Sequence, residues 1–154
     1  MEGWGPTGAA GAAGGLVLSI LISLTTEGCR AQKGDACGPS VLGPSSGTLS
    51  SLGYPGTYPN QSVCEWEISV PRGNRIHFHF AELDIEDGDC QVNYLRLYDG
   101  VGLERSEIVK YCGLGLKVKE LIASTGNQVT VQFMSRTHRR GRGFYLSYSA
   151  AEHT

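Results

Sequence analysis

The chain has 154 residues, a length typical of one domain, and a formal net charge of -2 at pH 7. This balance excludes a general nucleic-acid binder, because neutralising phosphate groups requires a basic face. The 22 glycines follow no collagen-like repeat, which excludes a triple-helical protein as well.

We predict that residues 1–31 form a secretory signal peptide. The apolar run Leu16–Leu24 is shorter than the roughly 20 apolar residues that cross a membrane, but it suits the apolar region of a signal peptide. Cys29 and Ala31 are small residues at the two positions that signal peptidase inspects, so we expect cleavage after Ala31. The segment before the run carries Glu2 and lacks Lys and Arg, which leaves an uncleaved N-terminal anchor as the alternative.

The cysteine count agrees with secretion. Five cysteines is an odd number, and the expected cleavage removes Cys29, which leaves an even set: Cys37, Cys64, Cys90 and Cys112. In an oxidising compartment this set indicates two disulfides, although spacing alone allows three ways of pairing them. The sequon at Asn60 has meaning only in the secretory pathway, so we expect an N-glycan there. We therefore expect a secreted, extracellular chain, and no later apolar run reaches membrane length.

After the signal peptide, the chain shows short segments in which apolar and polar residues alternate. They are residues 64–70, 75–83, 94–100, 128–134 and 143–149. Turn residues such as Pro71 and Gly73 separate them, and this pattern predicts an all-β protein, an antiparallel β-sandwich. Segment 114–124 is ambiguous and is compatible with one turn of helix. The predicted core residues are Trp66, Ile68, Ile76, Phe78, Phe80, Leu95, Leu97, Val129, Val131, Phe133, Phe144 and Leu146.

An ordered set of motifs in this region resembles a CUB domain. In chain order the motifs are Cys37, the segment from Gly47 to Glu86, CQVNYLRLYDG, YCG and a final strand that opens with GRGFYLSYS. The resemblance implies a jelly-roll-like β-sandwich at residues 37–150. A short N-terminal segment at 32–36 would precede it, and a C-terminal tail at 151–154 would follow it.

The resemblance also implies how the cysteines pair, with Cys37 joined to Cys64 and Cys90 joined to Cys112. Within the family, the motifs LDIEDGDC, NYLRLYDG, KYCGLGL and GRGF are most similar to the N-terminal CUB domain of the discoidin–CUB–LCCL receptors. Those receptors are neuropilin-like membrane proteins that continue into further domains.

No motif in the sequence indicates catalysis. There is no nucleophile elbow, no HExxH and no CxxC, so we expect no catalytic residue, no enzyme activity and no cofactor. His77 and His79 share one strand face without a third ligand, and we expect them at the surface opposite Phe78. The acidic run Asp84–Asp89 lacks the ligand order of an EF-hand, so we interpret Asp87 and Asp89 as parts of a solvated turn.

The family resemblance also implies a calcium site at the loop end of some CUB domains, built from one Glu and two Asp residues with a supporting Tyr. Glu86 and Tyr58 match the Glu and the Tyr, but Asn93 and Arg136 stand at the two Asp positions, and His138 stands at a later Ser position. Calcium needs 6–8 oxygen ligands, several of them usually anionic. We therefore predict a degenerate site that holds no metal, in which Arg136 reaches Glu86 and ties the loop instead.

Arg139, Arg140 and Arg142 form a basic cluster around Gly141 in a loop that enters the last strand. Guanidinium groups recognise carboxylate, sulfate or phosphate in a bidentate manner, so the cluster is a candidate partner-binding site; a merely solvated loop is the alternative. From the resemblance, we expect a non-catalytic extracellular module that binds a protein partner through its loops. A secreted single-CUB binder of sulfated glycan, similar to the spermadhesins, is the second hypothesis.

Overall fold

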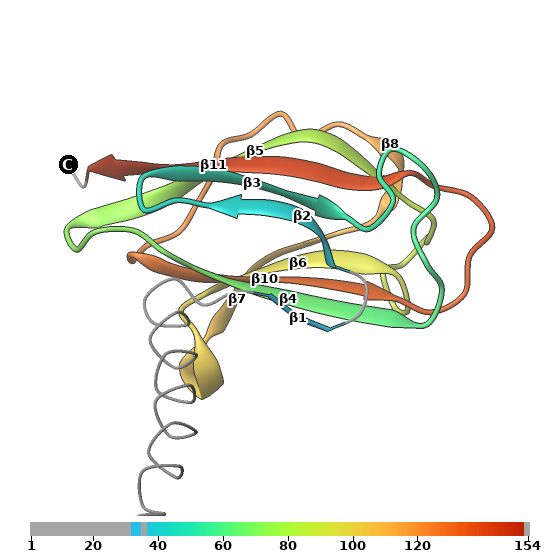
Figure 1. Ribbon diagram of the computed structural model, residues 1–154, viewed down its shortest axis with the longest axis horizontal. Helices are drawn as coiled ribbons and strands as arrows, with labels where there is room; N and C mark the ends of the chain where they lie inside the picture. Colours follow the sequence, from blue (N-terminus) through green and yellow to red (C-terminus); the bar gives the residue numbers. More distant parts are fainter. Residues whose placement is uncertain (1–31, 35–36, 153–154) are drawn as a thin grey trace, which may run out of the picture.

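The computed structural model describes residues 32–34 and 37–152 of the chain. The predicted signal peptide, including Cys29, and the last two residues of the predicted tail lie outside this part. Two antiparallel sheets pack face to face as a β-sandwich (Figure 1), which confirms the predicted fold class. In the described part, no helix is long and apolar enough to cross a membrane.

The first sheet has five strands in the order β1-β4-β10-β6-β7. Their bounds are β1 Gln32–Gly34, β4 Ser62–Ser69, β10 Gln128–Ser135, β6 Tyr94–Asp99 and β7 Ser106–Tyr111. The central strand β10 pairs with β4 on one side and with β6 on the other. A 3-10 turn, η1 Gly102–Glu104, precedes β7.

The second sheet has the order β2-β3-β11-β5-β8, and β9 pairs separately with β5. Their bounds are β2 Cys37–Leu42, β3 Ser46–Ser51, β11 Gly143–Glu152, β5 Asn74–Ile85, β8 Gly113–Leu116 and β9 Ile122–Ala123. The ambiguous segment 114–124 therefore contributes two short strand pieces to this sheet and contains no turn of helix.

The core lies between the two sheets, where the alternation in each strand places the apolar side chains. Every predicted core residue except Phe80 is buried. Phe80 is only partly buried. β11 pairs with β5 at this position, but on the other edge of β5 the strand β9 pairs at residues 77–78 and β8 only from Leu83 onward, so that edge has no partner strand beside Phe80. Apolar residues that the prediction omitted also belong to the core: Leu49, Tyr58, Leu83, Ile85 and Tyr148.

Both disulfides have the expected pairing. Cys37 pairs with Cys64, with their Cα atoms 5.3 Å apart, and this bond joins the two sheets. Cys90 pairs with Cys112, with their Cα atoms 5.4 Å apart, and this bond ties the turn after β5 to the end of β7.

Candidate functional site

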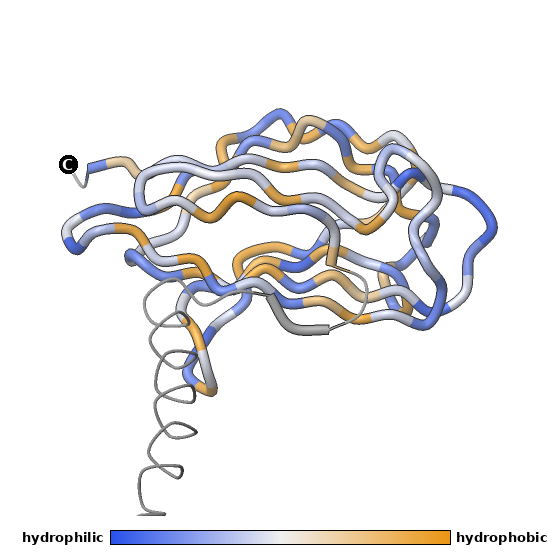
Figure 2. The backbone as a smooth tube through the Cα atoms, in the orientation of Figure 1, coloured by the Kyte–Doolittle hydropathy of each residue, from blue (hydrophilic) through white to orange (hydrophobic). Residues whose placement is uncertain are grey.

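The loop between β10 and β11, residues 136–142, crosses from one sheet to the other at one end of the sandwich. We call it the arginine loop. Figure 2 shows it as a hydrophilic segment at the far right, next to the turn after β5. The sequence explains part of its path: Gly141 has a φ of 109°, and a Cβ there would lie 2.7 Å from the carbonyl oxygen of Asp84.

Two carboxylates hold the backbone of the arginine loop. Oε1 of Glu86 accepts hydrogen bonds from the backbone N–H of Arg139 at 2.7 Å and of Arg140 at 3.1 Å. Oδ2 of Asp84 accepts one from the backbone N–H of Arg142 at 2.8 Å. The N–H groups of Arg139 and Arg140 lower the pKa of Glu86, because they favour its ionised form. Glu86 and Asp84 are thus bound to the loop's backbone rather than to its guanidinium groups.

Asn93 ties the turn after β5 to the start of the arginine loop. Its Nδ2 donates to the backbone oxygen of Glu86 at 2.9 Å and to that of Thr137 at 3.0 Å. Its Oδ1 accepts from the backbone N–H of Arg136 at 2.7 Å. The Asn93 side chain is buried, so its three bonds are partly shielded from water.

His138 closes the loop against the turn that carries the predicted glycan. Its backbone N–H donates to Oδ1 of Asn60 at 3.2 Å, and its ring stacks on Tyr58 with the centroids 3.7 Å apart. The Tyr58 hydroxyl accepts a hydrogen bond from the backbone N–H of Glu86, and burial raises the pKa of Tyr58 to about 12. Asn60 itself is exposed, immediately beside the arginine loop.

Asp87 has a larger role than the solvated turn residue that we expected. Its carboxylate accepts hydrogen bonds from the backbone N–H groups of Asp89, Val92 and Asn93, and so it shapes the turn itself. Burial alone raises the pKa of Asp87, but the N–H groups of Val92, Asn93 and Asp89 outweigh it and bring the pKa to about 2. Asp89, by contrast, is exposed as expected.

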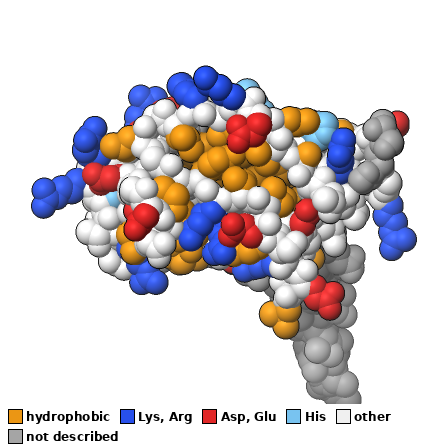
Figure 3. All heavy atoms as spheres, turned by 180° about the vertical axis from the view of Figure 1, so that it is seen from behind, with side chains coloured by type: hydrophobic (Ala, Val, Ile, Leu, Met, Phe, Trp, Pro, Cys, Tyr) orange, Lys and Arg blue, Asp and Glu red, His pale blue; other side chains and the backbone are white. Residues whose placement is uncertain are grey.

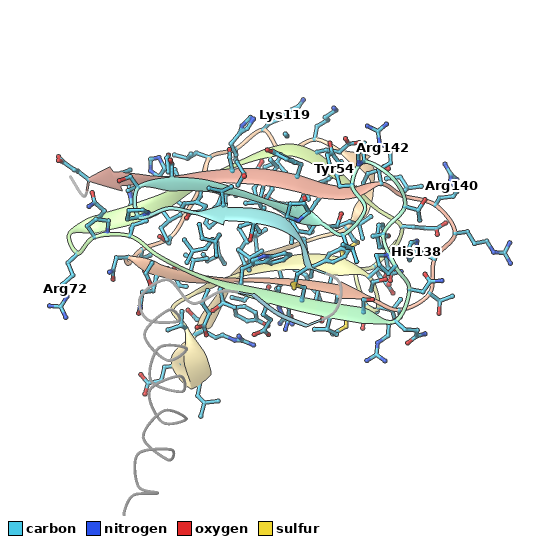
Figure 4. All side chains as sticks on the ribbon, in the orientation of Figure 1. Tyr54, Arg72, Lys119, His138, Arg140 and Arg142 are labelled. Carbon is cyan, nitrogen blue, oxygen red and sulfur yellow. A yellow bond between two sulfur atoms is a disulfide. The ribbon has the colours of Figure 1, made fainter. Side chains whose placement is uncertain are left out.

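The predicted ion pair between Arg136 and Glu86 is wrong. In the described part of the chain, the Glu86 carboxylate bonds to backbone N–H groups, and the Arg136 side chain is exposed. The arginine that forms an ion pair is Arg142, whose guanidinium donates to Oε1 of Glu82 at 2.9 Å. The hydroxyl of Tyr54 donates to the same oxygen at 2.7 Å, and Figure 4 shows Arg142 and Tyr54 close together.

Among the described residues, the guanidinium groups of the loop that have no acidic partner therefore belong to Arg136, Arg139 and Arg140, whereas Arg142 is exposed but paired with Glu82. Within the described residues they have neither an ion pair nor a side-chain hydrogen bond. Figure 4 shows Arg140 pointing away from the sandwich, and Figure 3 shows basic side chains projecting from this end, which lies on the left in that view. The loop presents positive charge to solvent from a fixed backbone.

Basic side chains on the outer face of the first sheet differ, because they are already paired. Arg105 forms two hydrogen bonds with Glu65 at 3.3 Å and lies over the ring of Tyr98, 4.2 Å from its centroid. Arg96 bonds Glu107 at 2.6 Å. These contacts neutralise the sheet face, so the arginine loop is the better candidate for an acidic partner.

The sequence alone gave no signal for three of these features: the loop-tying role of Asn93, the pairing of Arg142, and the contact between Asn60 and the loop. Each joins segments more than 40 residues apart. The histidines lie as expected on the face opposite Phe78, with His79 exposed and His77 half-buried. Within the described residues, no group of three or more His, Cys, Asp or Glu side chains is arranged to hold a metal ion.

Comparison with known proteins adds three findings. The model of the CUB domain family matches residues 37–148. The chain is 56% identical over 123 residues to rat discoidin, CUB and LCCL domain-containing protein 2; the match covers 79% of this chain and 16% of that relative. The chain thus spans about a sixth of the relative's length.

Two solved structures share the fold. The full extracellular region of zebrafish Gpr126/Adgrg6 matches with a TM-score of 0.60 and 30% identity, over 72% of this chain and 14% of that one. The MASP-1 CUB2 domain bound to Ca²⁺ matches with a TM-score of 0.58 and 27% identity, over 70% of this chain and 95% of that one.

Proposed function

This chain belongs to the CUB domain family, and on that premise we propose that it is a non-catalytic extracellular module that binds another protein through its arginine loop. Two disulfides suit an oxidising compartment, and one structural relative is itself the extracellular region of a larger protein. The absence of catalytic motifs from the sequence supports a binding role. Cleavage of residues 1–31 as a signal peptide is part of this proposal.

One observation carries the proposal: among the described residues, the arginine loop keeps three guanidinium groups exposed and without an acidic partner while its backbone is fixed. Hydrogen bonds that its backbone N–H groups donate to the side chains of Glu86, Asp84 and Asn93 restrict the loop before any partner arrives. Binding to a fixed loop avoids most of the entropy cost of ordering it. Exposed guanidinium groups attract carboxylates over about 8 Å at physiological ionic strength. An acidic protein surface is therefore the partner class that this loop suits.

The proposal is tested with the secreted, tagged full chain, added to cells whose surface proteins are intact. Changing Arg136, Arg139 and Arg140 to Ser should reduce cell binding by at least about tenfold, because each substitution removes a guanidinium group that can form charge-assisted hydrogen bonds with the partner. The matched control changes three exposed basic residues elsewhere to Ser: Arg72, Lys117 and Lys119. Equal loss in both variants would mean that net charge alone drives binding and would contradict the proposal.

A sulfated-glycan binder remains the second candidate, because the exposed cations cluster within one short loop and lack acidic partners among the described residues. Heparinase treatment of the cells separates the two functions. Binding that survives heparinase and depends on Arg136, Arg139 and Arg140 supports a protein partner. Binding that heparinase removes, together with salt-sensitive retention on heparin, supports the glycan.

We also propose that Asn60 carries an N-glycan. The residue is exposed, and its Oδ1, which glycosylation leaves in place, accepts the hydrogen bond from His138. A glycan at this position would stand beside the arginine loop and limit the approach of a partner from that side. A mobility shift of the secreted chain after glycosidase treatment tests it.

A further inference from the structure

We infer that the carboxamide of Asn93 replaces, in this chain, the divalent cation that ties the loop end of calcium-bound CUB domains, so the arginine loop keeps its shape without calcium. The inference deepens the proposed function, because it says how the proposed binding surface is held.

Two backbone oxygens converge on the Asn93 side chain, so the atom between them must be a hydrogen-bond donor or a cation. Nδ2 lies 2.9 Å from the backbone oxygen of Glu86 and 3.0 Å from that of Thr137. Both oxygens are carbonyl groups and can only accept, so the atom bonded to both is the amide nitrogen. The bond from the N–H of Arg136 to Oδ1 fixes the same orientation independently. One side-chain amide thus joins two segments that lie 44 positions apart.

The other residues at this end do not fit a calcium ion. Glu86 supplies the single carboxylate of the three positions named by the family resemblance, and its Oε1 already accepts from the N–H groups of Arg139 and Arg140. Asn93 directs hydrogens, not lone pairs, at the neighbouring carbonyl oxygens. Calcium needs 6–8 oxygen ligands, several of them usually anionic, and this set cannot supply them.

One substitution should restore the need for a cation at this position. In Asn93→Asp, an oxygen replaces Nδ2 and faces the carbonyl oxygens of Glu86 and Thr137 with no proton between them. Three oxygens that converge in a buried position repel one another unless a cation or a proton joins them. The variant should therefore lose stability at neutral pH and regain part of it when calcium is added.

The test is thermal unfolding of the full secreted chain, in calcium and in chelator. The wild type should melt at the same temperature in both. Asn93→Asp should melt at least about 5 °C lower in chelator, and calcium should restore part of this loss. Asn93→Ala should melt lower in both conditions, since it lacks both the amide and a carboxylate.

Asn127→Asp is the matched control. The Asn127 amide donates to the backbone oxygen of Val70 at 2.9 Å, far from the arginine loop, and its change should lower the melting temperature without creating a response to calcium. A wild type stabilised by calcium would overturn the inference. So would an Asn93→Asp variant that calcium stabilises no more than it stabilises Asn127→Asp.

These readouts separate the inference from the proposed function. Melting temperatures report only how the loop is held, whereas the cell-binding experiment reports what the loop binds. Wild-type melting that is the same in calcium and in chelator supports the inference, whatever the cell-binding experiment shows. If melting does not depend on calcium but cell binding does not depend on the three arginines, the role of Asn93 is supported and the proposed function is rejected.

Discussion

The two ends of the sandwich are closed by different chemistry. At the end with the arginine loop, the carboxylates of Glu86 and Asp84 accept hydrogen bonds from the loop's backbone. At the opposite end, where β5 begins on the left in Figure 1, amide and hydroxyl groups hold the turns at 70–74 and 124–128, together with one carboxylate, since Asp99 accepts from the backbone N–H of Thr125 at 2.9 Å. There, Asn127 donates to Val70, and Thr130 donates to the backbone oxygen of Gly100 at 2.9 Å.

The difference shows how a loop can be rigid and still present charge. At the arginine loop, acidic side chains fix the backbone, so the guanidinium groups of Arg136, Arg139 and Arg140 stay available to a partner. At the opposite end, amide and hydroxyl groups and the single carboxylate of Asp99 satisfy backbone groups, and the described residues there include no comparable cluster of arginines. Both ends close the core, but within residues 37–152 it is the arginine-loop end that combines a fixed backbone with a cluster of exposed like charges.

We expect the largest effect from removing the disulfide at the arginine-loop end. Changing both Cys90 and Cys112 to Ser should lower the free energy of unfolding by about 3 kcal/mol, since the unfolded chain is no longer cross-linked. Urea unfolding followed by the fluorescence of the buried Trp66 measures this. Cell binding should fall as well, because the bond anchors the turn that holds the arginine loop. Unchanged binding would show that the loop does not depend on that turn.

A smaller effect should come from the opposite end. Asn127→Ala removes a hydrogen bond to the backbone oxygen of Val70 and should cost about 1–2 kcal/mol in the same unfolding experiment. Cell binding should match the wild type, because no contact of Asn127 reaches the arginine loop. Reduced binding by a folded Asn127→Ala variant would mean that the two ends are coupled, and the comparison would fail.

As the pH falls, the arginine-loop end should lose hydrogen-exchange protection before the opposite end does. Hydrogen bonds lower the pKa of Glu86, and they bring that of Asp87 to about 2, below the ordinary value near 4. A carboxylate with a lowered pKa stabilises the fold above its ordinary pKa, and this stabilisation is lost as the pH falls through the folded value. Between pH 4 and pH 2, hydrogen exchange corrected for intrinsic rates should accelerate at Val92 and Arg139. The amide of Ile76, which donates to the neutral hydroxyl of Ser124, should stay protected longer.

Simultaneous loss of protection at both ends would indicate global unfolding instead. The Asp87→Asn variant tests whether the Asp87 carboxylate is responsible for the local effect. Its protection at Val92 should be lower at neutral pH and less dependent on pH, because an amide does not titrate in this range.

The smallest expected effect concerns the glycan. Ser62→Ala removes the sequon but keeps Asn60 and its bond to His138. If the glycan limits access to the arginine loop, the variant should bind cells more tightly by less than about 1 kcal/mol, or roughly fivefold. Titration of the labelled chain on cells measures the change. Weaker binding by this variant would indicate that the glycan contributes to recognition.

The sequence by itself determined the fold class, because a strand places successive side chains on opposite faces. The alternation around Trp66 and Val131 therefore identified core positions without any knowledge of the neighbouring strands. The same reasoning failed at Phe80, since alternation shows which face a side chain occupies but not how completely the neighbouring strands cover it; here only one edge of β5 has a partner strand. The disulfide pairing needed the family resemblance, because spacing left three possibilities.

Only the tertiary structure decided which arginine is paired and what holds the loop. Arg142 meets Glu82 from a position 60 residues away, and Asn93 meets Thr137 across 44. Hydrogen bonds and ion pairs depend on distances of about 3 Å, which are set when the two sheets and their loops pack. A local pattern contains no information on such distances. The motif at Arg136 therefore identified the correct end of the sandwich, but it assigned the ion pair to Arg136 instead of Arg142.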